Sequence, residues 1–215
     1  KDPMVKTVVL TGAGSVFCGG EGIEYFTRTL AYDFGQHVED AKMYIRLAQI
    51  IYSLRKPVVA KVNGLAHGAG CLLATVCDYV VASEKASFGF IEAHHGLIPA
   101  LALPFLVKKI GEGRAREMML RGHIVTAAQA KVYGLVTAVA PPEYLDSEVA
   151  QITTELCTQV SSASMGLMKE MFATLDGMKL SESIDYAANM HAAARMTDDG
   201  KKGVAAIITR EKLTW

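Results

Sequence analysis

The chain has 215 residues, of which 51% are hydrophobic, and its 22 basic residues balance 22 acidic ones to a formal net charge of zero. This composition predicts one substantial packed domain and excludes a disordered chain. A neutral chain has no overall field to attract nucleic acid or an anionic membrane, although a local basic patch could exist, and its apolar runs are too short to cross a bilayer. We therefore expect neither nucleic acid nor a membrane as a partner.

The predicted elements begin with a β-branched run at residues 5–11, which ends at a glycine turn and is typical of a buried strand. A second such run covers residues 57–62. Between them, apolar residues at spacings of three and four predict a helix; they are Val38, Ala41, Ile45, Ala48 and Tyr52. Strand, helix and strand form a βαβ unit with a right-handed crossover. Because the chain enters a central-type strand almost at once, with no edge strand before it, we expect that preceding sequence is missing here.

The alternation continues along the chain, with a helix predicted at 70–76 and a strand at 79–82. Beyond Pro99, helical patterns dominate at residues 102–110, 114–120 and 127–133, and three or four more helices follow a short strand at 135–140. The late helices are rich in alanine and methionine, which is typical of a core or a subunit interface. These patterns predict an α/β core over residues 1–140 and a helical region over residues 141–215.

The cysteines give no sign of a disulfide framework or a metal site. Cys18, Cys71, Cys77 and Cys157 form no C-x-x-C pair and no zinc-type cluster with histidine. Three of them lie in apolar contexts, where a free, buried thiol is the usual state. We therefore expect a reducing, cytoplasmic location and no metal.

The first of two glycine-rich turns follows the first predicted strand and includes Gly19, Gly20 and Gly22. Such a turn could cradle a nucleotide phosphate, but G-x-G-x-x-G is absent in the required register, and no Gly-Lys-Ser/Thr follows to make a P-loop. On spacing alone, a tight connection that needs positive φ angles is the better interpretation.

The second turn covers residues 63–70 and again leads from a buried strand into a helix. Small residues let the backbone approach a ligand closely, and the start of a helix presents unpaired N–H groups at its positive dipole end. Two such turns could direct two N–H groups at one oxygen, which is what a developing enolate or oxyanion needs.

Both turns resemble signatures of the crotonase (enoyl-CoA hydratase/isomerase) superfamily. The first segment is VVLTGAGSVFCGGEGI, and the second is KPVVAKVNGLAHGAGCLLATVCDYVVASEKASFGFIEAHHGLIP. The resemblance continues through GLVTAVAP and DDGKKGVAAIITREK. It implies a crotonase-like α/β spiral of ββα units, with a helical C-terminal region that builds homotrimers or hexamers. It also implies another strand and helix before the first segment, which agrees with the abrupt start of the chain. It also implies a substrate carried as a CoA or acyl-carrier-protein thioester, and no metal or redox cofactor.

The resemblance assigns roles to individual residues. The oxyanion-hole donors correspond to the backbone N–H groups of Glu21 and Ala69. Family hydratases commonly use two glutamates, and one of those positions is Leu72 here, which cannot transfer protons. The other, in the pattern F-G-x-x-E, corresponds to Glu92, whose apolar neighbours would desolvate it and raise its pKa. The implied substrate-binding residues are Gly19, Gly20, Gly22, His67, Gly68, Gly70, Leu72 and His95.

Other candidates keep two interpretations each. His94 and His95 could form a polar pocket wall or simply pack, and His67 could face the acyl group or form an ordinary hydrogen bond. His191 is better explained as structural. Tyr25 and residues 26–35 occupy the region of the family's acyl pocket. The basic residues could meet CoA phosphates across a subunit interface, although solvated surface charge explains them equally; they are Lys201, Lys202, Arg210 and Lys212.

Three functions remain open on the sequence. The first is an acyl-thioester hydratase or isomerase with Glu92 as its acid/base, and GCLLATVCDY resembles monofunctional Δ3,Δ2-enoyl-CoA isomerases. The second rests on EAHHGLIPALALPFL, which resembles methylglutaconyl-CoA hydratases and the dehydratases of polyketide β-branching that act on carrier-protein-bound intermediates. The third, motivated by Leu72, is a non-catalytic protein that binds acyl-CoA.

Overall fold

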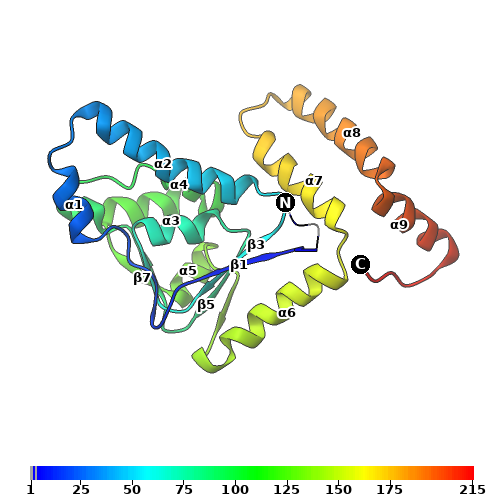
Figure 1. The fold of residues 1–215 in the computed structure, drawn as a ribbon, viewed down its shortest axis with the longest axis horizontal. Coiled ribbons are helices and arrows are strands. Elements are labelled where there is room, and N and C mark those ends of the chain that lie inside the picture. The colour runs from blue at the N-terminus through cyan, green and yellow to red at the C-terminus, as the bar shows by residue number, and fades with distance from the viewer. Residues whose placement is uncertain (1, 3) are drawn as a thin grey trace.

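The structure is a computed structural model that describes Asp2 and residues 4–215. Within these residues, eight strands form two sheets of four (Figure 1). The first sheet has the order β1 (Val8–Thr11), β3 (Val58–Val62), β5 (Tyr79–Ser83) and β8 (Ala138–Ala140), all parallel. The second has the order β2 (Val16–Cys18), β4 (Leu65–His67), β6 (Ser87–Gly89) and β7 (Ile124–Thr126), of which only β7 is antiparallel to its neighbour.

Helices follow the strands in regular succession. They are α1 (Ile23–Thr29), α2 (Phe34–Ser53), α3 (Ala69–Val76), α4 (Leu103–Arg121), α5 (Ala127–Tyr133), α6 (Leu145–Thr158), α7 (Ser162–Thr174), α8 (Leu180–Met196) and α9 (Asp198–Thr209), with short 3-10 helices η1 (Ile91–His95) and η2 (Pro142–Tyr144). The first three turns of the chain each add one strand to each sheet and then a helix, as in β1-β2-α1 and β3-β4-α3, whereas in the last turn α5 lies between β7 and β8. This is the predicted spiral of ββα units.

The two central strands of the first sheet, β3 and β5, are buried on both faces, and their side chains point to the two faces in alternation. Val58, Ala60 and Val62 point into the main core, which also contains the fully buried Phe88 and Leu106. The intervening side chains point to the opposite face, where a second cluster packs against α6 and α7; it consists of Val59, Val81, Leu145, Val149, Leu156 and Met165. The spiral is therefore held rigidly between helices.

The structure changes several predicted boundaries. The strand expected at 5–11 is β1, which begins only at Val8, and the strand expected at 135–140 is β8, which begins at Ala138. The helices expected at 102–110 and 114–120 are the two halves of α4, which are separated by Gly111 at a non-helical φ of 77°. The strands β2, β4, β6 and β7 were not predicted, and each has only three residues.

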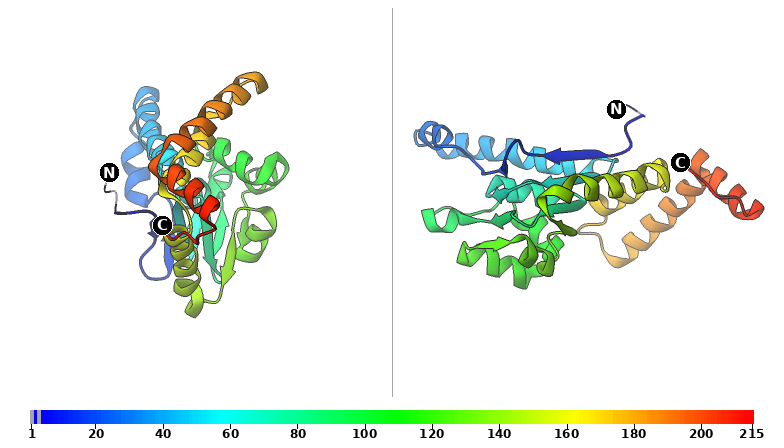
Figure 2. Two further views of the ribbon diagram at one scale, coloured as in Figure 1. Left: turned by 90° about the vertical axis from the view of Figure 1, so that its right-hand side faces the viewer. Right: turned by 90° about the horizontal axis from the view of Figure 1, so that it is seen from below.

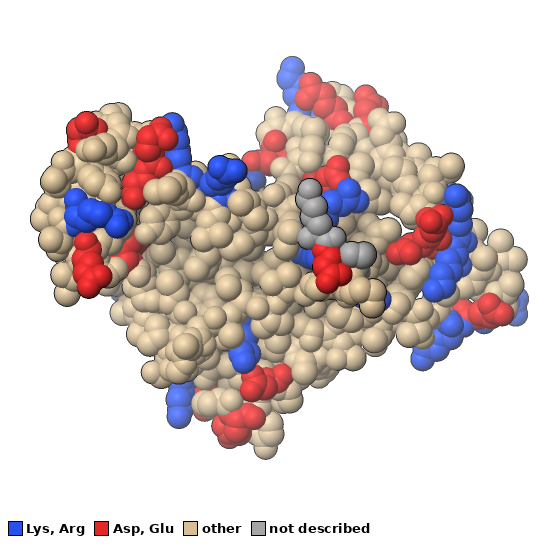
Figure 3. Space-filling view, viewed as in Figure 1, with Lys and Arg blue, Asp and Glu red and all other residues tan. Residues whose placement is uncertain are grey.

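The C-terminal part of the chain is helical from Pro142 to Thr209, and α8 and α9 extend away from the sheets (Figures 1 and 2). Among the described residues, α8 buries no side chain and α9 buries only Ala206. None of the described helices is both long and apolar enough to span a membrane. On the face shown in Figure 3, basic and acidic side chains lie side by side, in keeping with the zero net charge.

Candidate active site

The two glycine-rich turns lie next to each other. β2 and β4 are parallel neighbours, so their carboxyl ends meet at one edge of the second sheet. Gly20 has a φ of 89° and Gly68 a φ of 53°, conformations that other residues rarely adopt. A Cβ atom on Gly70 would lie 2.0 Å from the carbonyl oxygen of Cys18. Only glycine therefore lets α3 begin directly against the first turn.

This packing brings into contact the two turns that carry the candidate N–H groups. A Cβ atom on Gly20 would lie 3.7 Å from the nitrogen of Ala69, so the residue that precedes Glu21 touches the start of α3. Ala69 is the first residue of α3, where the helix itself offers no acceptor. Within the described residues, neither the Ala69 nor the Glu21 N–H donates a hydrogen bond to the protein. Both donors are available to a ligand.

Glu92 reaches the same point from a third element. It lies in η1, directly after β6, and Gly89 at the end of β6 accepts a hydrogen bond of 3.0 Å from the N–H of Gly68. Oε1 of Glu92 would lie 3.4 Å from a Cβ atom on Gly68. Its other oxygen, Oε2, is buried and has no hydrogen-bond partner in the described part of the chain.

The environment of Glu92 favours its protonated form. Burial has the largest effect and raises the pKa of the Glu92 carboxyl; the backbone N–H of Glu92 lowers it by less, and the negative charge of Glu21, the smallest of the three effects, raises it. A raised pKa brings a carboxyl group closer to neutral pH, where it can exchange protons with a substrate.

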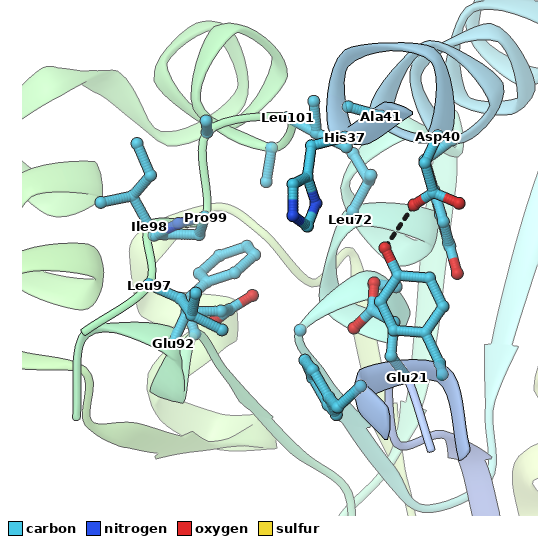
Figure 4. A pocket seen from close by; sticks show the side chains of 18 residues that line it. Glu21, His37, Asp40, Ala41, Leu72, Glu92, Leu97, Ile98, Pro99 and Leu101 are labelled. Carbon is cyan, nitrogen blue, oxygen red and sulfur yellow. Dashed lines mark hydrogen bonds between the residues drawn. The ribbon is translucent and has the colours of Figure 1, made fainter. Parts of the chain in front are cut away.

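Two adjoining cavities open at this point, of which Figure 4 shows the first. The first has a volume of about 420 Å³ and the second about 380 Å³, and Glu21, Phe26, Gly68, Glu92 and Leu97 line both. Such volumes suit part of a small-molecule ligand. The side chain of Leu72 lines the first cavity and is 95% buried, with 5% of its surface exposed. The position at which the family resemblance places a glutamate is therefore an apolar wall.

Helix α2 contributes a polar wall that the sequence interpretation missed. His37, Asp40 and Tyr44 line the first cavity, and Asp40 is only 7% exposed. The hydroxyl of Tyr25 donates a hydrogen bond to the Asp40 carboxylate, and burial together with this bond raises the pKa of Tyr25 (Figure 4). The signal for this wall was present in the polar residues of α2 at spacings of three and four.

The four histidines singled out in the sequence lie in different environments. His95 lines the second cavity. His94 instead packs against the end of α4, where its Nε2 lies 3.0 Å from the carbonyl oxygen of Arg121. Nε2 of His67 lies 3.0 Å from the Ser87 hydroxyl, and burial lowers its pKa, so the ordinary hydrogen-bonded interpretation describes it. His191 is exposed on α8.

The remaining predicted residues divide between the site and the rest of the molecule. Gly19, Gly20 and Gly68 line the second cavity, whereas Gly22 and Gly70 line neither. Of the residues assigned to the acyl-pocket region, Tyr25 and Phe26 line the first cavity and residues 27–35 do not. The four basic residues near the C-terminus lie on or just beyond α9, at the opposite end of the molecule from α1 (Figure 1). Among the described residues, no group of three potential ligands could hold a metal ion.

Comparison with known proteins relates these features to one family. The sequence model described as enoyl-CoA hydratase/isomerase matches residues 1–215. The chain is 33% identical to the mitochondrial enoyl-CoA hydratase of Pongo abelii, over 99% of this chain and 71% of that protein. It is 35% identical to a Thermus thermophilus protein described provisionally as an enoyl-CoA hydratase, over 97% of this chain and 82% of that protein.

Solved structures show the same fold. The crystal structure of an enoyl-CoA hydratase from Bacillus anthracis matches with a TM-score of 0.89 and 27% identity, over all of this chain and 83% of that chain. An enoyl-CoA hydratase subunit I of Geobacillus kaustophilus matches with a TM-score of 0.89 and 30% identity, over all of this chain and 82% of that chain. The α/β spiral predicted from the family resemblance is confirmed.

Proposed function

Because the chain belongs to the enoyl-CoA hydratase/isomerase family, we propose that it is an enzyme that moves protons on an enoyl thioester and stabilises the thioester enolate between these steps. The observation that supports this best is Glu92, whose half-buried carboxyl lies beside Gly68, the residue that precedes one of the two unpaired N–H groups. The substrate is a thioester of CoA or of an acyl carrier protein. Since only protons are transferred, the chemistry requires neither a metal nor a redox cofactor.

The N–H groups of Glu21 and Ala69 form the proposed oxyanion hole. When a proton leaves the α-carbon, negative charge develops on the thioester oxygen, and two fixed donors stabilise that charge at the moment it forms. Removal of one such donor typically costs about 3–4 kcal/mol of transition-state stabilisation. The glycines around these donors are what allow the two turns to approach closely enough to share one oxygen.

Glu92 is the proposed acid/base. In a 3-enoyl thioester, its carboxylate removes a proton from the α-carbon, and the enolate electrons spread to the γ-carbon, which then receives the proton from the same carboxyl group. This moves the double bond from position 3 to position 2 with a single carboxylate. Isomerisation is therefore the reaction that the site supports even with Leu72 at the other glutamate position.

A hydratase or dehydratase of methylglutaconyl-type thioesters, including carrier-protein-bound intermediates, is the second candidate. It is favoured by the segment EAHHGLIPALALPFL, because the residues within it at 97–102 line the first cavity and so contribute to the acyl site. An assay with methylglutaconyl-CoA and with a carrier-protein thioester compares this candidate with simple enoyl-CoA substrates.

The decisive test is turnover of crotonyl-CoA and of a 3-enoyl-CoA by the wild type and by Glu92→Gln. General acid–base catalysis contributes about 100- to 10,000-fold to rate, so this variant is expected to lose at least about 100-fold in both reactions. Glu24→Gln is the matched control, since Glu24 is exposed on α1 and lines neither cavity. Full activity of Glu92→Gln would refute the assignment, and binding of CoA esters without any turnover would support the non-catalytic alternative.

Two further properties belong to this proposal. The family resemblance suggests a homotrimer or hexamer, and the exposed apolar residues of α8 and α9 are compatible with a subunit contact. The four cysteines are all free thiols, which supports a cytoplasmic location.

A further inference from the structure

The side chain of Glu21 lies in the site, although only its backbone was expected to act. Glu21 lines both cavities, and its Oε2 would lie 4.0 Å from the same Gly68 Cβ position that is 3.4 Å from Oε1 of Glu92. Figure 4 shows Glu21 on one side of the cavity and Glu92 on the other. Two carboxylates from two different turns therefore flank one point.

We propose that the Glu21 carboxylate is the second proton-transfer group of this site, serving the β-carbon of the substrate while Glu92 serves the α-carbon. The inference rests on the proposed function and extends it to hydration and dehydration. The Glu21 carboxylate takes the place of the glutamate that family hydratases carry at the position of Leu72 on α3. The backbone N–H of Glu21 binds the thioester oxygen, and the side chain of the same residue extends into the cavity that receives the acyl group.

The proton inventory of hydration balances with these two groups. The Glu21 carboxylate takes a proton from a water molecule as the water oxygen bonds to the β-carbon. The π electrons of the double bond move toward the thioester, whose oxygen holds the resulting enolate charge. The enolate then takes a proton at the α-carbon from the Glu92 carboxyl group. The product is a 3-hydroxyacyl thioester, with Glu21 protonated and Glu92 ionised, and proton exchange with solvent restores the starting state.

The environments of the two carboxyl groups agree with these roles, in which Glu21 is the base and Glu92 the acid. Of two neighbouring carboxyl groups in different environments, the more buried one has the higher pKa and binds a proton more readily. Glu92 is that group, since burial and the charge of Glu21 both raise its pKa. Asp40 is the third carboxylate of the first cavity, but it already accepts the hydrogen bond from Tyr25. Of the two carboxylates beside Gly68, Glu21 is thus the one suited to act as the base.

Comparison of hydration and isomerisation separates the two carboxylates. Hydration of crotonyl-CoA needs both groups, whereas isomerisation of a 3-enoyl-CoA needs only Glu92. Glu21→Gln keeps the backbone N–H and is expected to slow hydration by about 100-fold or more, while isomerisation falls by less than about tenfold. Glu21→Asp keeps a carboxylate and should retain more hydration than Glu21→Gln. Glu24→Gln, the same change three residues along the chain, should affect neither reaction.

The outcomes distinguish this inference from the function on which it rests. If Glu92→Gln abolishes both reactions while Glu21→Gln hydrates normally, the inference is wrong and the proposed function stands. An equal loss of both reactions in Glu21→Gln also contradicts it, since that result assigns Glu21 to substrate placement. If the wild type turns over no thioester, the proposed function and the inference fail together.

Discussion

Burial and the charge of Glu21 raise the pKa of the Glu92 carboxyl. The kcat/KM values of isomerisation and of hydration should change in opposite directions as the pH passes through this pKa. Isomerisation begins with ionised Glu92, so kcat/KM should fall as the pH decreases through the raised pKa. Hydration uses protonated Glu92 at the α-carbon, so its kcat/KM should fall as the pH increases through the same value. Profiles of kcat/KM against pH for both substrates measure the two limbs, and limbs of the same sign would contradict the assignment of Glu92.

Removal of the Glu21 charge should shift the low-pH limb of the kcat/KM profile for isomerisation. Because the carboxylate of Glu21 raises the pKa of Glu92, Glu21→Gln lowers that pKa and extends isomerisation to lower pH. The other polar groups of the first cavity are unchanged in this variant; they are Tyr25, His37, Asp40 and Tyr44. The pH profiles of wild type, Glu21→Gln and Glu24→Gln measure the shift, and a profile of Glu21→Gln that superimposes on the wild type would show that the two carboxylates do not interact.

Gly68 matters both for the backbone conformation of its turn and for the position of Glu92. Its φ of 53° is unfavourable for a side chain, and an added Cβ would touch Glu92 at 3.4 Å. We expect Gly68→Ala to lower the free energy of unfolding by about 1–3 kcal/mol and to reduce kcat by at least about tenfold. Urea denaturation and steady-state kinetics measure these effects. Gly22→Ala is the control, because Gly22 has a φ of −80° and open space around it, and an equal effect there would contradict the argument.

At the level of residues, the sequence revealed the parts of the site that belong to a motif. Glu92, Glu21 and Ala69 lie in the two segments that resemble the family, and the structure brings them together. The motif assigns only the backbone of Glu21 to the site, because its side-chain direction depends on the positive φ of the preceding Gly20. Asp40 escaped notice because no motif marks it and its pairing with Tyr25 depends on how α1 folds against α2.

At the scale of elements, the carboxylate of Asp78, which lies just beyond the C-terminal end of α3, links β3 to α7. Oδ2 of Asp78 accepts hydrogen bonds of 2.7 Å from the N–H of Val58 and 2.6 Å from Nζ of Lys169. The side chain of Lys169 is only 7% exposed. Asp78→Ala should lower the free energy of unfolding by about 3–5 kcal/mol, because it leaves a buried ammonium group unpaired. Urea denaturation measures this change.

Two further variants give this prediction its controls. Addition of Lys169→Met to Asp78→Ala removes the unpaired charge and should restore part of the stability. Glu39→Ala breaks the ion pair with Lys42, whose side chains are 73% and 62% exposed, and should cost at most about 1 kcal/mol. An Asp78→Ala variant that unfolds like the wild type would show that Lys169 is solvated and that α7 does not depend on this link.

The elements that periodicity predicted are the longer ones. Strands β3 and β5 have five residues each, and α2 has 20, so their apolar patterns are complete enough to be recognised. The second sheet consists of three-residue strands, which contain too few side chains to show alternation. They form because the longer strands of the first sheet place them side by side, and this tertiary effect leaves no local signal.

Over the whole molecule, the strand and helix patterns correctly predicted an α/β fold, but they could not predict which helices extend away from the sheets. Among the methionines at positions 165, 168, 171, 178, 190 and 196, only Met165 is buried, whereas Met168 and Met196 are 48% and 70% exposed. A methionine-rich stripe is found in cores and in interfaces alike, so the sequence does not distinguish the two. In a single chain, apolar residues of α8 and α9 such as Met196 and Ile207 lie at the surface, which makes an interface the better interpretation.

The last prediction concerns this surface. Ile207 and Ile208 on α9 are 78% and 75% exposed, and burial of isoleucine side chains against other subunits would stabilise an assembly by about 1.5–3 kcal/mol each. We expect light scattering after gel filtration to give a mass of three or six chains. The double variant Ile207→Asp with Ile208→Asp should shift the mass toward one chain. Thr209→Asp adds a charge to the same helix without removing an apolar side chain and should leave the assembly intact. A wild type with the mass of a single chain at micromolar concentration would contradict the expected homotrimer or hexamer.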